Sequence, residues 1–232
     1  MSPAPSTIRR ATLETCAEGQ GTVAVIDVLR ACTTACYAFL AGASEIVLAS
    51  TVDEAFALRE RYPEALTMGE VEGYPIEGFD LGNSPWRLAE HDLRGRRLIH
   101  RTTAGTQGAV RAAGARRLLG ACLCNLSATV AALRAAPPDE ITLLTTGIFP
   151  GGWGDEDAAC ADCIEALLAG RRLDLASVEA RVRASRSGLH FSDPASAAFP
   201  PQDIDLALAV DRFPYTLEIT RERDLLVMRP GG

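Results

Sequence analysis

The feature that most constrains the fold is an alternation of strand-like and helix-like segments along residues 1–170. Short apolar runs rich in β-branched residues alternate with segments of helical periodicity, about six times in all. The expected strands are 22–27, 45–49, 66–70, 97–101, 116–120 and 140–145. The expected helices are 30–41, 52–61, 105–113, 127–135 and 155–169, with a short helix near 85–90. This pattern predicts an α/β fold, a three-layer α/β/α sandwich with a mostly parallel or mixed sheet.

The last sixty or so residues follow a different pattern. We expect helices at 175–185 and 203–210, followed by two strands, 216–220 and 225–229, that form a terminal hairpin or edge strands. We interpret residues 1–232 as one domain, with a core of about 22–170 and a C-terminal appendage, 171–232.

Composition narrows the class of protein. The chain is 47% hydrophobic and 23% charged, which is ordinary for a globular protein. No apolar run reaches the roughly 18 residues of a membrane helix. The N-terminus lacks the apolar core of a signal peptide, so we expect no membrane association and a cytoplasmic location. A net charge of −7 argues against nucleic-acid binding but leaves room for a small anionic substrate bound by local arginines.

Three residue types, the basic residues, the cysteines and the histidines, bear on which other functions are excluded. All 23 basic residues counted as Lys or Arg are arginines, which excludes P-loop NTPases and Schiff-base enzymes. Cys160 and Cys163 have the spacing of a metal or redox motif, but they lie in an alanine-rich apolar segment. We interpret them as buried packing residues, with a zinc site as the alternative. The histidines His91, His100 and His190 are scattered, and we expect none of them to be functional.

Acidic residues gather where the expected strands end. In an open α/β sheet, ligands bind at the carboxyl ends of the strands. The turn-rich loop 78–85, GFDLGNSP, adds one more carboxylate to this set. Clustered carboxylates repel each other unless a hard cation neutralises them, and their oxygens are the ligands that Mg²⁺ prefers. We therefore expect Mg²⁺ to be bound by some of five residues: Asp27, Glu70, Asp80, Glu156 and Asp157.

A second group of residues is suited to an anion. The turn TTAGT at 102–106 opens a helix and offers backbone N–H groups and hydroxyls to a phosphate. The expected substrate-binding residues are Asn83, Ser84, Thr102, Thr103, Gly105, Thr106 and Asn125. We expect Arg30 to neutralise a substrate anion and to act in catalysis together with Asp27 and Asp80. Carboxylates beside an anion cradle indicate metal-assisted chemistry on a phosphate ester.

Each of these candidates also has a purely structural interpretation. Asp27 could cap the helix that follows it, and residues 155–157 could be acids favoured by the helix dipole. The turn 102–106 could be a plain strand-to-helix connection, and Arg30 could pair with a neighbouring carboxylate. The functional interpretation is favoured because the candidates occur at the same end of successive strands.

The chain resembles one particular phosphatase family. The signatures of cysteine, histidine and haloacid-dehalogenase-type phosphatases are absent. The motifs that carry the resemblance are VIDVLRACTT at 25–34, GE at 69–70, GFDLGNSP at 78–85, TTAGT at 102–106, CN at 124–125 and EDAACA at 156–161. In this order they are similar to the motifs of the 2-phosphosulfolactate phosphatases, the ComB family, over about residues 22–170.

The resemblance implies a function and leaves one alternative. It implies a phosphoric monoester hydrolase that converts 2-phospho-3-sulfolactate to 3-sulfolactate and phosphate with Mg²⁺, linked to coenzyme M biosynthesis, and it suggests a homodimer. The chain departs from the family pattern at Ala104, where an Asn is usual, and at Asp162, where a Gly is usual. Ala104 could alter the specificity for a related small acidic phosphate ester. The alternative is a non-catalytic anion-binding or regulatory module on the same scaffold.

Overall fold

The computed structural model describes residues 7–16, 21–135, 140–147 and 153–231. Their strands are β1 Ile8–Thr12, β2 Thr22–Ile26, β3 Glu45–Leu48, β4 Leu66–Val71, β5 Tyr74–Pro75, β6 Leu81–Gly82, β7 Arg97–Arg101, β8 Arg117–Ala121, β9 Ile141–Thr145, β10 Thr216–Glu222 and β11 Leu225–Gly231. Their α-helices are α1 Ala31–Leu40, α2 Val52–Arg61, α3 Pro85–Leu88, α4 Gly105–Arg111, α5 Leu126–Ala135, α6 Asp155–Leu168, α7 Leu175–Ala184, α8 Arg186–Leu189 and α9 Pro201–Ala207. Two 3₁₀ turns are η2 Leu123–Asn125 and η3 His190–Ser192.

The strands form one mixed sheet built from two parallel halves. The strand order is β1-β9-β2-β8-β10-β11-β3-β7-β4-β5, with β6 paired to β4. Strands β1, β9, β2 and β8 run parallel to one another, and so do β3, β7 and β4. The antiparallel hairpin β10–β11 joins the halves by pairing with β8 on one side and β3 on the other. The predicted hairpin is therefore present, but the interpretation of its strands as edge strands is wrong.

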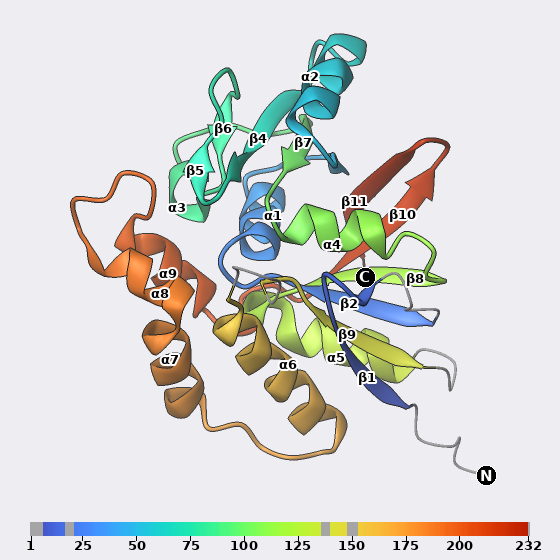
Figure 1. The fold of residues 1–232 in the computed structure, drawn as a ribbon, viewed down its shortest axis with the longest axis vertical. Helices are drawn as coiled ribbons and strands as arrows, with labels where there is room; N and C mark the ends of the chain where they lie inside the picture. The colour runs from blue at the N-terminus through green and yellow to red at the C-terminus, as the bar shows by residue number, and fades with distance from the viewer. Residues whose placement is uncertain (1–6, 17–20, 136–139, 148–152, 232) are drawn as a thin grey trace.

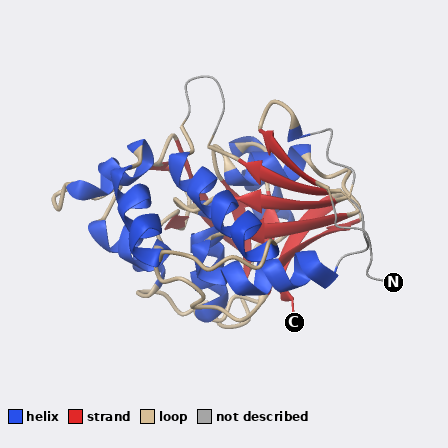
Figure 2. Ribbon diagram, turned by 90° about the horizontal axis from the view of Figure 1, so that it is seen from below, coloured by secondary structure: helices blue, strands red, loops and turns tan. Residues whose placement is uncertain are grey.

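Helices cover both faces of this sheet (Figures 1 and 2). In β2, Val23 and Val25 belong to the core cluster that includes α1 and α4, while Ala24 and Ile26 belong to the cluster that includes α5 and α6. This alternation is the period of two expected of a strand buried on both faces. A third cluster packs α2 against the other half of the sheet. The predicted three-layer α/β/α class is confirmed.

The C-terminal helices lie beside the sheet rather than over its centre (Figure 1). Helix α7 packs on α6, and α9 packs on α3 and on η3. The prediction placed a helix at 203–210, whereas α9 begins at Pro201, whose fixed φ suits the first turn. Strand β1 and the short helix α8 were not predicted, because β1 contains two arginines and forms no apolar run, and α8 spans only four residues.

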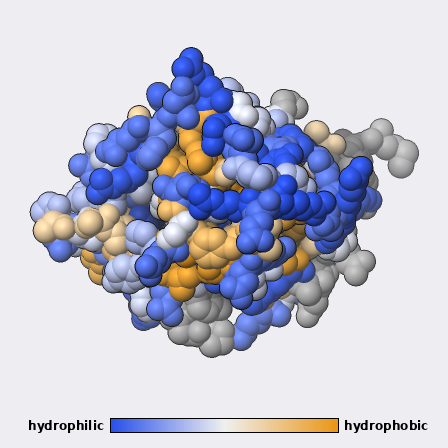
Figure 3. All heavy atoms as spheres, turned by 90° about the horizontal axis from the view of Figure 1, so that it is seen from above, coloured by the Kyte–Doolittle hydropathy of each residue, from blue (hydrophilic) through white to orange (hydrophobic). Residues whose placement is uncertain are grey.

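Most of the surface seen in Figure 3 is hydrophilic, with hydrophobic side chains gathered near the middle of that face. Across the described ranges, none of the helices has both the length and the apolar character needed to cross a bilayer. Cys160 and Cys163 are free thiols in the core between α6 and the sheet. This placement favours the interpretation of both as packing residues.

Candidate active site

One pocket lies at the carboxyl ends of β2, β4 and β9 and has a volume of about 420 Å³. Two groups of side chains with different chemistry line this pocket. We call the first the acidic wall: Asp27, Glu70, Glu72, Glu156 and Asp157. We call the second the aromatic wall: Tyr74, Trp153, His190, Phe191 and Phe199. Four of the five predicted metal-binding carboxylates therefore meet at one pocket.

Asp27 follows β2 directly and has two separate roles in the structure. Its Oδ1 accepts a hydrogen bond of 2.8 Å from the backbone N–H of Ala31 and so caps the first turn of α1. Its Oδ2 lies 3.4 Å from the hydroxyl of Thr146. Burial raises the pKa of the Asp27 carboxyl to about 6, because the charged form loses its hydration. The capping and functional interpretations are compatible, since each uses a different oxygen.

Asp157 ties the start of α6 to the ends of two strands. Its Oδ1 accepts a bond of 2.8 Å from the N–H of Val28, and its Oδ2 accepts one of 3.0 Å from the N–H of Gly147. Burial, followed by the negative charges of Glu156 and Asp27, raises the pKa of the Asp157 carboxyl well above its usual range. Both carboxylate oxygens of Asp157 therefore accept hydrogen bonds, which join the start of α6 to the residues that follow β2 and β9.

Glu156 has a buried carboxylate oxygen that lacks a hydrogen-bond partner in the described part of the chain. Its side chain is buried, with 2% of the residue exposed, and its Oε2 has no hydrogen-bond partner among the described residues. Burial raises the pKa of the Glu156 carboxyl to about 7. A buried carboxylate oxygen without a partner is costly unless a proton, a water or a cation satisfies it. Glu156 is therefore poised to take a ligand.

Glu70 and the predicted anion turn engage each other. The Glu70 carboxylate accepts bonds from the N–H and the hydroxyl of Thr103 at 2.6 and 3.1 Å, and from the N–H of Gly73 at 2.5 Å. Thr103 and Ala104 line the pocket. The N–H of Thr103, expected to meet a phosphate, is thus occupied by a carboxylate of the protein.

The other residues of the turn stabilise its conformation. Thr102 and Thr106 share several hydrogen bonds, including one from the N–H of Thr102 to the hydroxyl of Thr106 at 2.9 Å and one from the N–H of Thr106 to the hydroxyl of Thr102 at 3.0 Å. Both side chains are buried and lie outside the pocket lining. Gly105 lets α4 approach the site, because a Cβ there would lie 2.6 Å from Asp27 Oδ2. These contacts fit the plain strand-to-helix interpretation of Thr102 and Thr106.

Asp80 is the predicted carboxylate that the structure does not bring to the pocket. Its Oδ2 accepts bonds of 2.8 Å from the N–H and from the hydroxyl of Thr67, and its Oδ1 pairs with Arg59 at 3.0 Å. These contacts bind Asp80 to β4 and α2, so its carboxylate is directed away from the acidic wall. Its contacts are those of a residue that fixes the loop 78–85.

Of the predicted residues Asn83, Ser84 and Asn125, the first lines the pocket and the other two do not. Asn83 lines the pocket, and its Oδ1 lies 3.2 Å from Nε2 of His100, whose pKa burial lowers to about 3. Ser84 instead donates to Asp203 at 2.8 Å and caps α3. Asn125 is fully buried, and its Oδ1 accepts a bond of 2.9 Å from the N–H of Cys122. Asn83 is thus the amide placed to meet a substrate.

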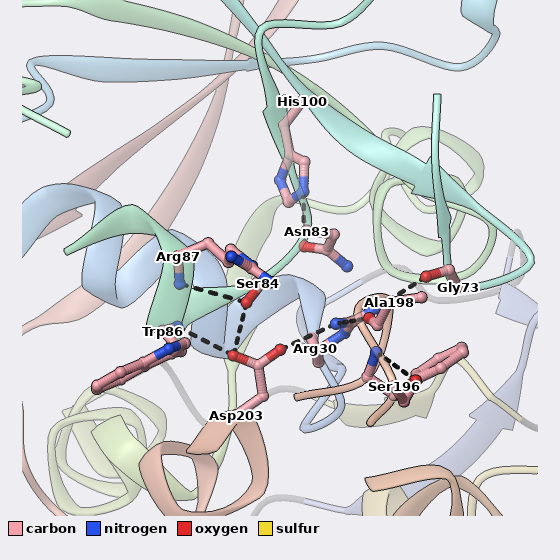
Figure 4. A network of polar contacts seen from close by, with 11 residues as sticks. Arg30, Gly73, Asn83, Ser84, Trp86, Arg87, His100, Ser196, Ala198 and Asp203 are labelled. Atoms are coloured by element: carbon pink, nitrogen blue, oxygen red, sulfur yellow. Dashed lines mark hydrogen bonds and ion pairs between the residues drawn. The ribbon is translucent and has the colours of Figure 1, made fainter. Parts of the chain in front are cut away.

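Arg30 lines the pocket and donates hydrogen bonds to three residues of the protein (Figure 4). It donates to Asp203 at 2.9 Å and to two backbone carbonyl oxygens at 2.8 and 2.9 Å. Its guanidinium also lies over the rings of Phe191 and Phe199, 5.3 and 5.1 Å from their centroids. The structural interpretation, a buried ion pair, therefore describes the contacts of Arg30. Its positive charge still lines the pocket.

The acidic wall consists of carboxylates, the ligand type that Mg²⁺ prefers. Over the described ranges, no group of three or more His, Cys, Asp or Glu side chains is arranged to hold a metal ion. However, Mg²⁺ keeps several waters and commonly binds through one or two carboxylates and a substrate phosphate. Among the buried carboxylates of the wall, and within the described residues, Glu156 Oε2 has no partner and Asp27 Oδ2 has only the Thr146 hydroxyl at 3.4 Å, so these oxygens leave room for such a site. Burial raises the pKa of each carboxyl, a cost that a bound cation would offset. The donor set thus fits the ion.

The sequence interpretation missed the aromatic wall. His190, expected to be without function, stacks between Trp153 and Phe199 at centroid distances of 6.1 and 5.1 Å. The rings come from β5, from the residue that precedes the N-cap of α6, and from the segment between α8 and α9. No periodic pattern links these positions, so sequence could not have grouped them. The acidic residue Asp203, which anchors Arg30, was missed for the same reason.

The fold and pocket define a class, an α/β protein with a buried acidic site at the carboxyl edge of its sheet. The sequence model of the 2-phosphosulpholactate phosphatase family matches residues 8–198. A probable 2-phosphosulfolactate phosphatase of Bacillus subtilis (strain 168) is 37% identical over 182 residues, which are 78% of each chain. One of Synechocystis sp. is 36% identical over 165 residues, 70% of this chain and 68% of the other. One of Deinococcus radiodurans is 43% identical over 147 residues, 62% and 61% of the two chains.

The chain belongs to the 2-phosphosulfolactate phosphatase family, whose members are phosphoric monoester hydrolases. The resemblance drawn from the sequence motifs is therefore confirmed.

Proposed function

We propose that this chain is a Mg²⁺-dependent phosphatase of 2-phospho-3-sulfolactate or a related small acidic phosphate ester. The products are the 2-hydroxy acid and phosphate. The observation that carries the proposal is the acidic wall, where Asp27 and Glu156 each present a carboxylate oxygen to the same pocket. Membership of the family supports the reaction class.

Three residues of the acidic wall, and Asn83 beside it, have a proposed task. When bound, Mg²⁺ supplies positive charge that polarises the phosphoryl group and acidifies a water. Asp27 Oδ2 and Glu156 Oε2 hold the ion. Asp157 orients the start of α6 through its bonds to Val28 and Gly147. Asn83 donates from its amide to the substrate, because its Oδ1 is directed to His100.

Two routes for phosphoryl transfer remain, and they differ in the attacking atom. In the first route a water attacks the phosphorus in line with the leaving alkoxide. In the second, Asp27 Oδ2 attacks and forms an acyl phosphate. We favour the first because Asp27 is already fixed by its bond to Ala31 and faces other carboxylates. A phosphoenzyme trapped by rapid quench would overturn it.

The test of the function is phosphate release from a panel of small phosphate esters, with Mg²⁺ and with EDTA. The panel includes 2-phospho-3-sulfolactate and 2-phospholactate. Release with Mg²⁺ and none with EDTA is the expected result. If the folded, Mg²⁺-loaded protein releases phosphate from no ester yet binds them saturably, the non-catalytic anion-binding module replaces the phosphatase. Ala104→Asn, which restores the usual family residue, then tests whether turnover returns.

Three further expectations belong to the same proposal. We expect the protein to act in the cytoplasm, to bind no nucleic acid, and to form a homodimer. Light scattering during gel filtration tests the homodimer, and a monomer at micromolar concentration would contradict it.

A further inference from the structure

The basic side chains that line the pocket are already engaged with the protein. Among the described lining residues they are Arg30 and His190. Arg30 donates to Asp203 and to two backbone carbonyl oxygens, and the His190 ring is stacked between two other rings. The proposed substrate carries a phosphate, a carboxylate and a sulfonate, and it enters a pocket lined by five carboxylates. An anion buried there without a partner is costly, so a further cation is needed.

One further guanidinium lies at the edge of this pocket. Arg186 is exposed, and its Cζ lies 5.8 Å from the ring centroid of Trp153, which lines the pocket. Within the described ranges, Arg186 forms no ion pair and no side-chain hydrogen bond. By contrast, Arg181 and Arg183 on the preceding helix are each paired with carboxylates. The five N–H donors of the Arg186 guanidinium are therefore available to a ligand.

The backbone that carries Arg186 is fixed beside the start of α6. Ser185 is buried and caps α8 by accepting a bond of 2.9 Å from the N–H of Gly188. Helix α8 packs on α6, which carries Glu156. Burial raises the pKa of the Glu156 carboxyl, and a hydrogen bond from Ser187 opposes that rise. The residue next to Arg186 thus contacts a carboxylate of the acidic wall, so one small substrate can reach both.

The chemistry of the substrate anions indicates which of them Arg186 binds. Phosphate and carboxylate oxygens are ligands that Mg²⁺ prefers, whereas a sulfonate is a weaker base than either and competes poorly for the ion. The phosphate and the carboxylate therefore belong on the side of Asp27 and Glu156. The sulfonate is left for a guanidinium, whose weak hydration and planar fork of donors suit the oxygens of such an anion.

We propose that Arg186 binds the sulfonate of the substrate at the Trp153 end of the aromatic wall and so determines specificity for the sulfonated ester. The inference rests on the proposed phosphatase function and adds to it a residue for the group that distinguishes this substrate from simpler phosphate esters. The Trp153 ring holds the guanidinium at the edge of the pocket, because a cation is attracted to the face of an aromatic ring.

The test compares 2-phospho-3-sulfolactate with 2-phospholactate, which keeps the carboxylate and lacks the sulfonate, in the presence of Mg²⁺. In Arg186→Gln we expect the ratio of kcat/KM for the sulfo ester to kcat/KM for 2-phospholactate to fall by about tenfold to hundredfold, the range for a hydrogen bond to a charged group. Arg186→Lys keeps the positive charge without the donor fork and should recover part of the ratio. The matched control is Arg183→Gln, which removes a guanidinium already paired with Glu179 and Asp205 and should leave the ratio unchanged.

Failure of this inference can be told apart from failure of the proposed function. A ratio that stays the same in Arg186→Gln, or that falls equally in Arg183→Gln, would overturn the inference while leaving the phosphatase in place. Release of phosphate from neither ester would contradict the phosphatase. In that case, or if only the sulfo ester is hydrolysed, calorimetric binding of 3-sulfolactate and lactate with Mg²⁺ decides the inference. Tighter binding of 3-sulfolactate that Arg186→Gln abolishes and Arg183→Gln keeps supports it, and any other result overturns it.

Discussion

The two walls of the pocket are built in different ways. The acidic wall is built where strands end, and backbone N–H groups at these ends hold Asp27, Glu70 and Asp157. The aromatic wall lies on segments outside the regular alternation and is held by one buried ion pair, Arg30 with Asp203. The comparison indicates that the sheet positions the groups for chemistry, while the added segments shape the space for the substrate. Mutations in each wall should therefore have different consequences.

The largest expected effect is on turnover, from Asp27→Asn. The variant keeps the cap on α1, since an amide oxygen can accept the bond from Ala31, but it loses the negative charge. We expect phosphate release to fall about 10³-fold, which corresponds to about 4 kcal/mol of activation free energy. The matched control is Asp80→Asn, the same substitution outside the acidic wall. Equal losses in both variants would contradict the separation of these two carboxylates.

The next effect is on stability, from Arg30→Met. The substitution leaves Asp203 buried without its partner, and breaking a buried pair in this way destabilises a fold by about 4 kcal/mol. Arg183→Met is the control, because Arg183 pairs with Asp205 and Glu179 at the surface and should cost under about 1 kcal/mol. Urea unfolding measures both free energies. A similar small loss in both would show that the ion pair does not anchor the aromatic wall.

The acidic wall should also make stability depend on pH in EDTA. The folded pKa of Asp27, about 6, is raised above its usual value of 3.8. This carboxyl therefore stabilises the fold below pH 3.8, and the contribution is lost as the pH rises through 6. Asp27→Asn should gain stability relative to the wild type between pH 4 and 8, by up to about 3 kcal/mol. An unchanged difference across that range, measured by urea unfolding, would contradict the raised pKa of the buried Asp27 carboxyl.

The smallest expected effect tests the close approach of α4 to Asp27 and to the start of α1. A methyl group at Gly105 would lie 2.6 Å from both Asp27 Oδ2 and Ala31 Cβ. Gly105→Ala should cost about 2 kcal/mol by overpacking and should also lower turnover. Gly114→Ala is the control, since nothing lies within 4 Å of a Cβ there. If the two variants unfold alike and turn over alike, Gly105 is not needed for the approach.

Most strands and helices of the first 170 residues could be predicted because their signals are local, whereas the strands β1, β5 and β6 were missed. Thr51, for example, caps α2 at its predicted start by accepting a bond from the N–H of Glu54. The meeting of Asp27 with Glu156 and Asp157 could also be expected, because parallel strands end at the same edge. Asp27, Glu156 and Asp157 each lie in a short motif that can be recognised in the sequence.

The features of the fold and the site that could not be predicted depend on contacts between residues that are far apart in the sequence. The central place of β10–β11 follows from pairing with β8 and β3, which no local pattern contains. The direction of Asp80 is set by Thr67 and Arg59, and Arg30 is bound by Asp203, which lies 173 residues away. The aromatic wall joins rings from three separate segments. Such placements are decided by packing rather than by periodicity.

The central claim is that the acidic wall binds a divalent cation through Asp27 and Glu156. Binding of Mn²⁺, followed by electron paramagnetic resonance in the presence of inorganic phosphate, tests it directly in the wild type and in Asp27→Asn. We predict one Mn²⁺ per chain in the wild type, displaced by excess Mg²⁺, and a loss of binding in Asp27→Asn that Asp80→Asn does not reproduce. Binding that survives Asp27→Asn unchanged, or no binding by the wild type, would contradict the claim.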